Sequence, residues 1–270
     1  MDSYVYQGLS HPKCIRLIKF LPTTATGGLN VSLHEARFED GTVQYECLSY
    51  VWGLPEPKAD LICDGKIMRI TKSLDEALYQ LQRASWTKYK TSDYFWVDQI
   101  CINQADNEEK REQVALMGAI YEHAECVWIW LGSEDAASVA VMDFMERAPP
   151  ASEVETYASN GSWNNTITSI LERPWFFRTW IVQEYIMAKR AMMFCGSRSV
   201  GSHKLLSMMA ACHNERGLQG MSNALNIATL DWRTIPGGEQ KAPFIRILHE
   251  FRDCEATDKR DKVYGLLGLA

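Results

Sequence analysis

Residues 94–132, YFWVDQICINQADNEEKREQVALMGAIYEHAECVWIWLG, decide the fold class of this chain. The runs at 94–98 and 126–131 are short and apolar, so each predicts a strand that is covered on both faces. Between them, Asp106 and Glu109 resemble a capping box, and a helix is predicted with one apolar face made of Val114, Met117, Tyr121 and Ala124. Strand, helix, strand is typical of a parallel sheet with crossover helices.

The sequence before this stretch predicts further strands and one helix. Residues 45–52, YECLSYVW, are nearly all apolar or aromatic and predict a strand that Gly53 ends. Looser apolar runs predict strands at 14–21 and 31–38. Asp64-Gly65 lies between two apolar runs and predicts a hairpin. Ser73 is expected to cap a helix that buries Leu74, Ala77, Leu78 and Leu81.

The sequence after this stretch predicts mostly helices. Residues 191–195, AMMFC, predict a last strand, residues 151–161 a polar loop and residues 217–241 a long irregular segment. Helices are expected at 135–147, 163–171, 175–189, 242–251 and 261–269. We therefore expect an α/β fold, a parallel sheet flanked by helices with extra N-terminal strands and a hairpin. Residues 1–270 are predicted to form one domain, with a core at about 15–200 and a helical C-terminal extension at about 201–270.

Composition excludes several classes of protein. The 270 residues are 46% hydrophobic and 23% charged, typical of a globular chain, and the net charge of -6 argues against nucleic-acid binding. The longest apolar run, 126–131, is too short to span a bilayer, and the first residues lack a signal sequence. The eight cysteines include no C-x-x-C pair, so we expect reduced thiols and a cytoplasmic protein. Nine tryptophans are unusual.

Common catalytic motifs are absent. The histidines and cysteines lack the spacing of metal ligands, so no metal site is expected. No phosphate-binding loop, dinucleotide fingerprint or G-x-S-x-G elbow occurs.

Four ordered segments are more specific. They are L-S-Y-x-W-G at 48–53, W-x-D-x-I-C-I-N-Q at 96–104, R-x-W-x-x-R-x-W-x-x-Q-E at 173–184 and D-x-R-D-K-V-Y-x-L-L-G-L at 258–269. Together they resemble the HET (heterokaryon incompatibility) domain of filamentous fungi, from about residue 15 to the end. The resemblance of the second segment continues to Gly132, and with this continuation the segments contain six of the nine tryptophans.

This resemblance implies a cell-death effector that acts after non-self recognition. Such modules are commonly joined to regulatory domains, and we expect partner proteins and self-association on activation. The family is considered a distant relative of TIR domains, which implies a TIR-like (flavodoxin-like) sheet. Residues 180–184, W-x-x-x-E, are similar to the TIR stretch whose glutamate cleaves NAD+, so the resemblance implies an NAD+ glycohydrolase, with NAD+ as substrate and no cofactor.

A carboxylate suits this chemistry. Nicotinamide leaves NAD+ as a neutral base, so one ionised glutamate can stabilise the oxocarbenium-like ribose that remains. The expected catalytic residue is Glu184, with Trp180 one helical turn away as an aromatic wall. The guanidinium groups of Arg173 and Arg178 suit the pyrophosphate. The opposite wall is expected from Ser49, Tyr50, Trp52, Gly53, Asp98, Asn103 and Gln104.

Structural alternatives remain for most of these residues. Trp52, Trp96, Trp128 and Trp130 fit the core around the sheet. Asp98 can brace neighbouring backbone, and Asn103 and Gln104 can shape a turn. Arg173 and Arg178 can pair with Glu172 or Glu184. Residues 108–112 are expected to be a solvated helix start.

Two other functions also remain open. One is a non-enzymatic signalling module that causes cell death by assembly or partner recruitment. The other is a nucleotide-binding switch without turnover, for which NAD+ would raise the melting temperature without product formation.

Overall fold

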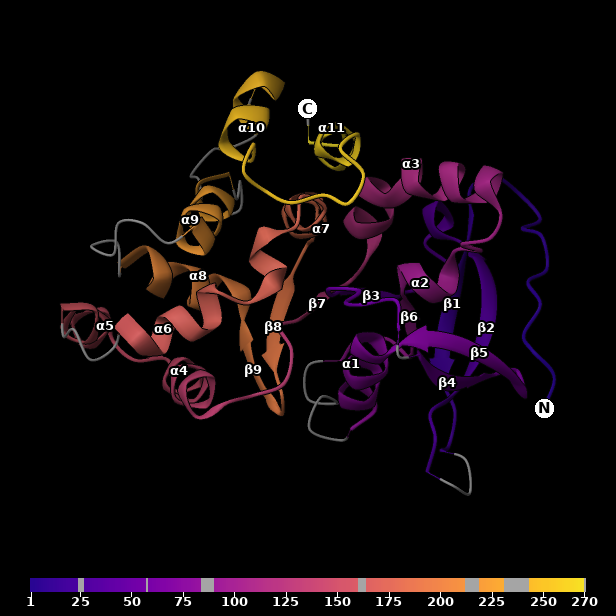
Figure 1. The fold of residues 1–270 in the computed structure, drawn as a ribbon, viewed down its shortest axis with the longest axis horizontal. Helices are drawn as coiled ribbons and strands as arrows, with labels where there is room; N and C mark the ends of the chain where they lie inside the picture. Colours follow the sequence, from indigo (N-terminus) through magenta and orange to yellow (C-terminus); the bar gives the residue numbers. More distant parts are fainter. Residues whose placement is uncertain are drawn as a thin grey trace. The chain divides into compact units, whose positions relative to one another are not determined.

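The computed structural model describes residues 1–23, 27–56, 58–83, 90–159, 164–211, 219–230 and 243–269. The chain divides into two compact units (Figure 1). The first comprises Met1–Trp128 with Ala188–Arg190, and the second comprises Ile129–Met187 with Ala191–Ala270. The single domain expected over residues 1–270 stays a prediction.

The first unit is built on a mixed sheet. Its strands are β1 (Cys14–Phe20), β2 (Asn30–Arg37), β3 (Glu46–Ser49), β4 (Lys58–Cys63), β5 (Lys66–Thr71), β6 (Tyr94–Trp96) and the start of β7 (Val127–Trp130). Their order is β5-β4-β2-β1-β6-β3-β7. The strands predicted at 14–21, 31–38 and 94–98 are confirmed, and the strand predicted at 45–52 is shorter than expected.

Strand direction differs from the expectation of a parallel sheet. β3 and β6 are parallel, as are β2 and β4, but β1 is antiparallel to both of its neighbours, β2 and β6. Apolar runs predict where strands form, but they do not show which strands pair or in which direction. The antiparallel direction of β1 therefore could not be predicted from them. The predicted hairpin of β4 and β5 is confirmed, and Asp64 and Gly65 adopt the positive φ angles of 48° and 74° that its tight turn needs.

The helices of the first unit follow the expected apolar faces. α1 (Lys72–Gln82) buries Leu74, Ala77, Leu78 and Leu81, as predicted. Its cap is Thr71, whose hydroxyl accepts a hydrogen bond from the Leu74 amide, and not Ser73. The short α2 (Asp98–Cys101) was not expected, and a 3-10 turn, η1, spans Phe38–Asp40. α3 (Asn107–His123) begins after Asp106, as predicted.

A buried carboxylate joins three strands of this sheet. Glu46 of β3 is fully buried. One of its oxygens accepts hydrogen bonds from the amide and the hydroxyl of Thr91, just before β6, both at 2.7 Å. The other accepts the indole N–H of Trp128 in β7, also at 2.7 Å. Because a buried charge is stable only when its oxygens are hydrogen-bonded, these donors make Glu46 a link between β6, β3 and β7.

The second unit has three strands and most of the helices. The end of β7 is followed in the strand order by β8 (Ala191–Cys195) and β9 (Arg198–Gly201), which form an antiparallel hairpin. The helices are α4 (Ala136–Glu146), α5 (Ala151–Ser159), α6 (Asn164–Leu171), α7 (Ile181–Ile186), α8 (Ser202–Ala211), α9 (Gln219–Leu230), α10 (Phe244–Glu250) and α11 (Asp261–Leu267), and a 3-10 turn, η4, spans Pro174–Phe177.

Several expectations for the second unit are wrong. The loop expected at 151–161 is helical as α5, and β9 and α8 were missed. The helix expected at 175–189 is divided into η4 and α7, because Arg178 has an extended backbone (φ -79°, ψ 140°). α9 occupies part of the segment expected to be irregular, whose residues 217–218 and 231–241 lie outside the described residues.

Among the described helices, none has the length and apolar character required to cross a bilayer.

We predict that Glu46→Gln lowers the free energy of unfolding by about 2–3 kcal/mol. The new N–H₂ group would face one of the donors that now bind the carboxylate, and two donors cannot form a hydrogen bond. The control is Glu125→Gln in the same unit. Its carboxylate forms a partly exposed ion pair with Lys189 at 3.3 Å, which the substitution removes. Its expected cost is below about 1 kcal/mol. Urea unfolding of both variants measures the difference, and equal losses would contradict the role of Glu46.

Candidate functional site

The last residue of β3 and the loop after it carry the first group of predicted site residues. Ser49 and Tyr50 are buried, Trp52 is half-buried, and the hydroxyl of Ser73 in α1 holds the loop by donating to the carbonyl of Val51 at 2.6 Å. Gly53 has φ +71°, and a Cβ there would lie 3.3 Å from the Cβ of Ser73. Glycine therefore allows the close approach of this loop to α1.

Trp52, Asp98 and Gln104 come together at the carboxyl ends of the parallel strands β3 and β6. The indole N–H of Trp52 donates to Oδ2 of Asp98 at 2.7 Å, and Oδ1 of Asp98 accepts the amide of Gln99 at 2.7 Å. The side-chain amide of Gln104 donates to the backbone carbonyl of Asp98 at 3.0 Å. The bracing role that was an alternative for Asp98 is therefore observed, and it fixes the indole of Trp52 beside α2.

Asn103 shapes the turn between α2 and α3. Its side-chain oxygen accepts the amide of Ala105 at 3.3 Å, and its own amide donates to Oε1 of Glu109 at 2.7 Å. This turn holds Gln104 next to Asp98, since Asn103 and Gln104 are consecutive.

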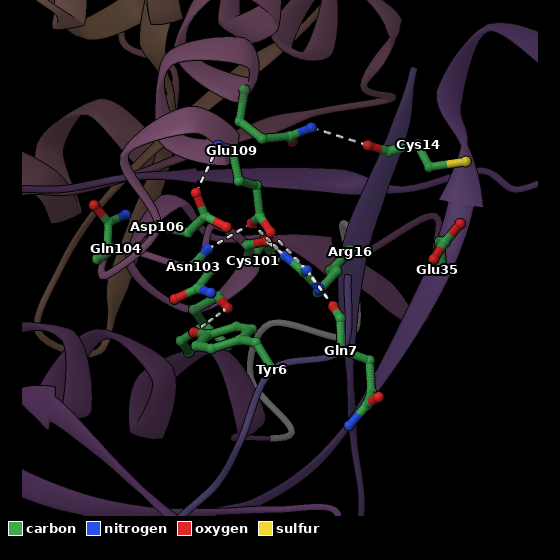
Figure 2. Close-up of polar contacts among 12 residues, drawn as sticks. Tyr6, Gln7, Cys14, Arg16, Glu35, Cys101, Asn103, Gln104, Asp106 and Glu109 are labelled. Atoms are coloured by element: carbon green, nitrogen blue, oxygen red, sulfur yellow. Dashed lines mark hydrogen bonds and ion pairs between the residues drawn. The ribbon is translucent and has the colours of Figure 1, made fainter. Parts of the chain in front are cut away.

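A buried ion pair underlies the turn (Figure 2). Arg16 of β1 donates to both oxygens of Glu109, at 2.6 and 2.9 Å, and the two side chains are only 5% and 11% exposed. Arg16 also donates to the carbonyls of Cys101 at 3.1 Å and Gln7 at 2.6 Å. The bidentate pair thus joins β1 to both ends of the turn that follows α2.

The same pair alters the ionisation of Arg16. Burial acts to lower the pKa of the guanidinium, but the hydrogen bond and charge of Glu109 outweigh it and raise the pKa. The ion pair with Glu109 therefore favours the charged form of Arg16.

The sequence pattern does not predict this ion pair. Glu109 was expected in a solvated helix start, yet its side chain turns away from the Asp106 amide to Arg16. Asp106 caps the helix alone, accepting the amides of Glu108 and Glu109 at 2.9 and 3.1 Å. An arginine in the middle of the apolar strand at 14–21 was the signal that a buried carboxylate was needed.

The second group of predicted site residues lies in the second unit. Trp180 is half-buried at the start of α7, and the Glu184 amide donates to its carbonyl at 3.1 Å, so the two side chains stand one helical turn apart as expected. Glu184 is 2% exposed, and all six residues of α7 are buried. The carboxylate therefore lies within the packed interior.

Arg173 braces the segment that follows β7. Its guanidinium donates to the carbonyls of Leu131 at 3.0 Å and Ser133 at 2.7 Å, and it pairs with Asp135 at 2.9 Å. The bracing alternative for Arg173 is thus observed, with Asp135 as the acid in place of Glu172 or Glu184.

Arg178 lies where the chain meets a C-terminal segment. Its backbone forms a bridge with Glu255, and the carbonyl of Glu255 accepts the amide of Thr179 at 2.9 Å. The structure therefore places Arg178 at a backbone junction between η4 and α7.

The described residues contain no cluster of three or more side chains that could hold a metal ion. In each unit, polar side chains of the motif residues are used in hydrogen bonds within the protein. Examples are Trp52 with Asp98 in the first unit and Arg173 with the carbonyl of Leu131 in the second.

We predict that Glu109→Gln costs about 3 kcal/mol of folding free energy, because it leaves the buried guanidinium of Arg16 without a countercharge. Glu108→Gln is the matched control on the exposed face of the same turn, with an expected loss of at most about 1 kcal/mol from the helix dipole. The difference should persist in 1 M salt, because buried pairs are weakly screened. A difference that salt abolishes would show that the pair is solvated.

Known proteins match both the central part of this chain and nearly its whole length. The model of the family described as heterokaryon incompatibility protein (HET) matches residues 45–184, just over half of the 270 residues. Heterokaryon incompatibility protein 6, OR allele, of Neurospora crassa is 29% identical over 335 residues, covering 99% of this chain. The chain spans 49% of that relative's length. No solved structure matches. From the family match over its central motifs, this chain belongs to the heterokaryon incompatibility (HET) family.

Proposed function

We propose that this chain acts in fungal heterokaryon incompatibility, as an effector that triggers cell death after non-self recognition. The observation that carries the proposal is the HET match over residues 45–184, which includes β3 and β6 of the first unit and the W-x-x-x-E stretch of the second. The Neurospora relative has a name that refers to the same process. Because that relative is about twice as long, the proposed regulatory partners include domains outside this chain.

The proposed mechanism rests on a relationship to TIR domains. When the hairpin strands β4 and β5 are left out, β3, β6 and β7 follow one another in the chain, and their order across the sheet, β6-β3-β7, matches the 2-1-3 order of flavodoxin-like sheets. The L-S-Y-x-W-G segment follows the first of these strands, at its carboxyl end, where ligands of such sheets bind. Both features support a TIR-like fold.

In this mechanism, NAD+ is hydrolysed to nicotinamide and ADP-ribose. The bond between ribose and nicotinamide breaks, its electron pair leaves with the neutral nicotinamide, and water adds to the ribose with release of a proton. Glu184 holds the ribose hydroxyls and stabilises the positive charge on the sugar. Trp180 supplies an aromatic wall, and Arg178 remains the proposed contact to the pyrophosphate, since Arg173 is engaged with Asp135.

Burial of Glu184 links the proposed activity to association. At 2% exposure, the carboxylate cannot contact a nucleotide unless α7 or its neighbours rearrange. We therefore propose that NAD+ is cleaved only when copies of the chain associate, with the change in packing that this brings. The proposed location is the cytoplasm, where the seven described cysteines, all buried and none of them in a disulfide, would stay reduced.

We predict that Glu184→Gln lowers nicotinamide release from NAD+ by about 100-fold or more, because it removes the charge that stabilises the ribose cation. Glu172→Gln, an exposed glutamate of the same unit, is the control and should retain the rate. The rate per molecule should rise with protein concentration. If the concentrated wild type releases nicotinamide only at the background rate, as Glu184→Gln does, the enzymatic mechanism is refuted.

A non-enzymatic signalling module is the second candidate. It is favoured by two observations, the burial of Glu184 and the use of Arg173 in contacts within the protein. In this function, the chain causes death by assembly or by recruiting a partner, and the W-x-x-x-E stretch is part of the core.

The two candidates differ in a cell-death assay. Expression of Glu184→Gln in a sensitive fungal strain is expected to abolish death if NAD+ cleavage is the mechanism, and to leave it intact if the chain only assembles. Melting temperatures of wild type, Glu184→Gln and Glu172→Gln, measured in parallel, separate loss of chemistry from loss of folding. Death that continues with a folded Glu184→Gln variant would decide for the second candidate.

A further inference from the structure

The first residues of the chain lie as an extended arm against the first unit. We define the N-terminal arm as residues 2–7, DSYVYQ. Tyr4 and Tyr6 are half-buried, whereas Val5 between them is 63% exposed. This alternation is that of a strand with one face against the protein.

The arm pairs with the end strand of the sheet. Ser3 forms a parallel bridge with Ile67 of β5, the amide of Ile67 donates to the carbonyl of Asp2 at 2.9 Å, and the amide of Tyr4 donates to the carbonyl of Ile67 at 2.7 Å. β5 begins the strand order, so the arm covers backbone groups that would otherwise form an open edge.

Tyr6 and Gln7 fasten the other end of the arm (Figure 2). The Tyr6 hydroxyl donates to the carbonyl of Ile100 in α2 at 2.8 Å, and burial raises the pKa of this phenol, so it stays a donor. The guanidinium carbon of Arg16 lies 5.0 Å from the centroid of the Tyr6 ring. Arg16 also donates to the carbonyl of Gln7 at 2.6 Å, and its position is held by Glu109.

The connection between the arm and β1 contributes little to this attachment. Residues 8–13 form neither helix nor strand, and all of them except Leu9 are exposed. Apart from the turn before β1, this connection contacts the rest of the unit through the Ser10 amide, which donates to Glu35, and through an exposed ion pair of Lys13 with Glu39 at 2.9 Å. The arm is thus a short extended segment held on a seat, defined here as Ile67, Ile100 and Arg16.

We propose that this seat also accepts the arm of a second copy, so that two chains dimerise by exchanging residues 2–7. The seat recognises backbone groups and a tyrosine hydroxyl, and a second copy presents the same groups in the same order. Exchange therefore replaces each contact by an identical one, and a mutual exchange closes as a two-fold dimer. This inference is independent of NAD+ cleavage, since none of its residues belongs to the second unit.

Changing the length of the connection tests the exchange in the whole chain. Deletion of residues 8–10 shortens its reach by roughly 10 Å, which should prevent the arm from reaching its own seat and favour dimers. Insertion of three Gly/Ser residues at the same place should favour the monomer. Because the deletion also removes Ser10, Ser10→Ala with a connection of normal length is the control.

Light scattering coupled to size-exclusion chromatography measures the outcome over a range of protein concentrations. We expect a dimer for the deletion variant at concentrations where the insertion variant and Ser10→Ala are monomeric. Removal of residues 1–7 from the deletion variant should return it to the monomer. A folded deletion variant that is monomeric at every concentration would overturn the proposal.

Peptide binding gives a second test that does not depend on folding of the deletion variant. A fluorescent peptide of residues 1–8 should bind a chain that lacks residues 1–7, measured by anisotropy, and should bind the intact chain more weakly because its own arm competes. Tyr6→Phe in the peptide should weaken binding roughly three- to tenfold, as expected for one hydrogen bond, and Val5→Ala should change little. Absence of saturable binding, or equal binding of all three peptides, would also overturn the proposal.

Discussion

The fully buried carboxylate of Glu46 is the constraint on which the first unit depends. A charge in the interior is tolerated only where donors replace the water that it has lost, and here the donors come from Thr91 before β6 and Trp128 in β7. The strands must therefore lie on either side of β3 at a defined register. An apolar residue at this position would pack with less restriction, which is why a charged group can specify one arrangement of the sheet.

The ion pair of Arg16 and Glu109 plays a comparable part at the edge of the predicted site. It connects β1, the turn after α2 and the N-terminal arm, which are distant in sequence. Glu109 accepts the Asn103 amide and so positions the turn. In this turn Gln104 donates to the carbonyl of Asp98, and the carboxylate of Asp98 accepts the indole N–H of Trp52. The polar residues of the second family segment thus form a continuous set of hydrogen bonds.

Much of the family pattern is explained by such structural contacts. Asp98, Asn103 and Arg173 all use their polar atoms to hold backbone or a neighbouring side chain. Glu184 stands out because it is 2% exposed, on a helix whose six residues are all buried, while the proposed mechanism needs its carboxylate to contact a nucleotide. This residue is therefore where structural and catalytic interpretations of the family diverge most.

The sequence by itself determined the local elements and the family. Apolar runs located β1, β6 and β8, the Asp64-Gly65 turn located a hairpin, and Asp106 located the start of α3. These features depend on neighbours within a few residues, so they are visible in the chain. Only the tertiary structure decided the direction of β1, the division of 175–189 into η4 and α7, and the pairing of Arg16 with Glu109. Each of these depends on groups far apart in sequence, and the free energy of burying a charge or pairing a strand is set by the partner that the fold supplies.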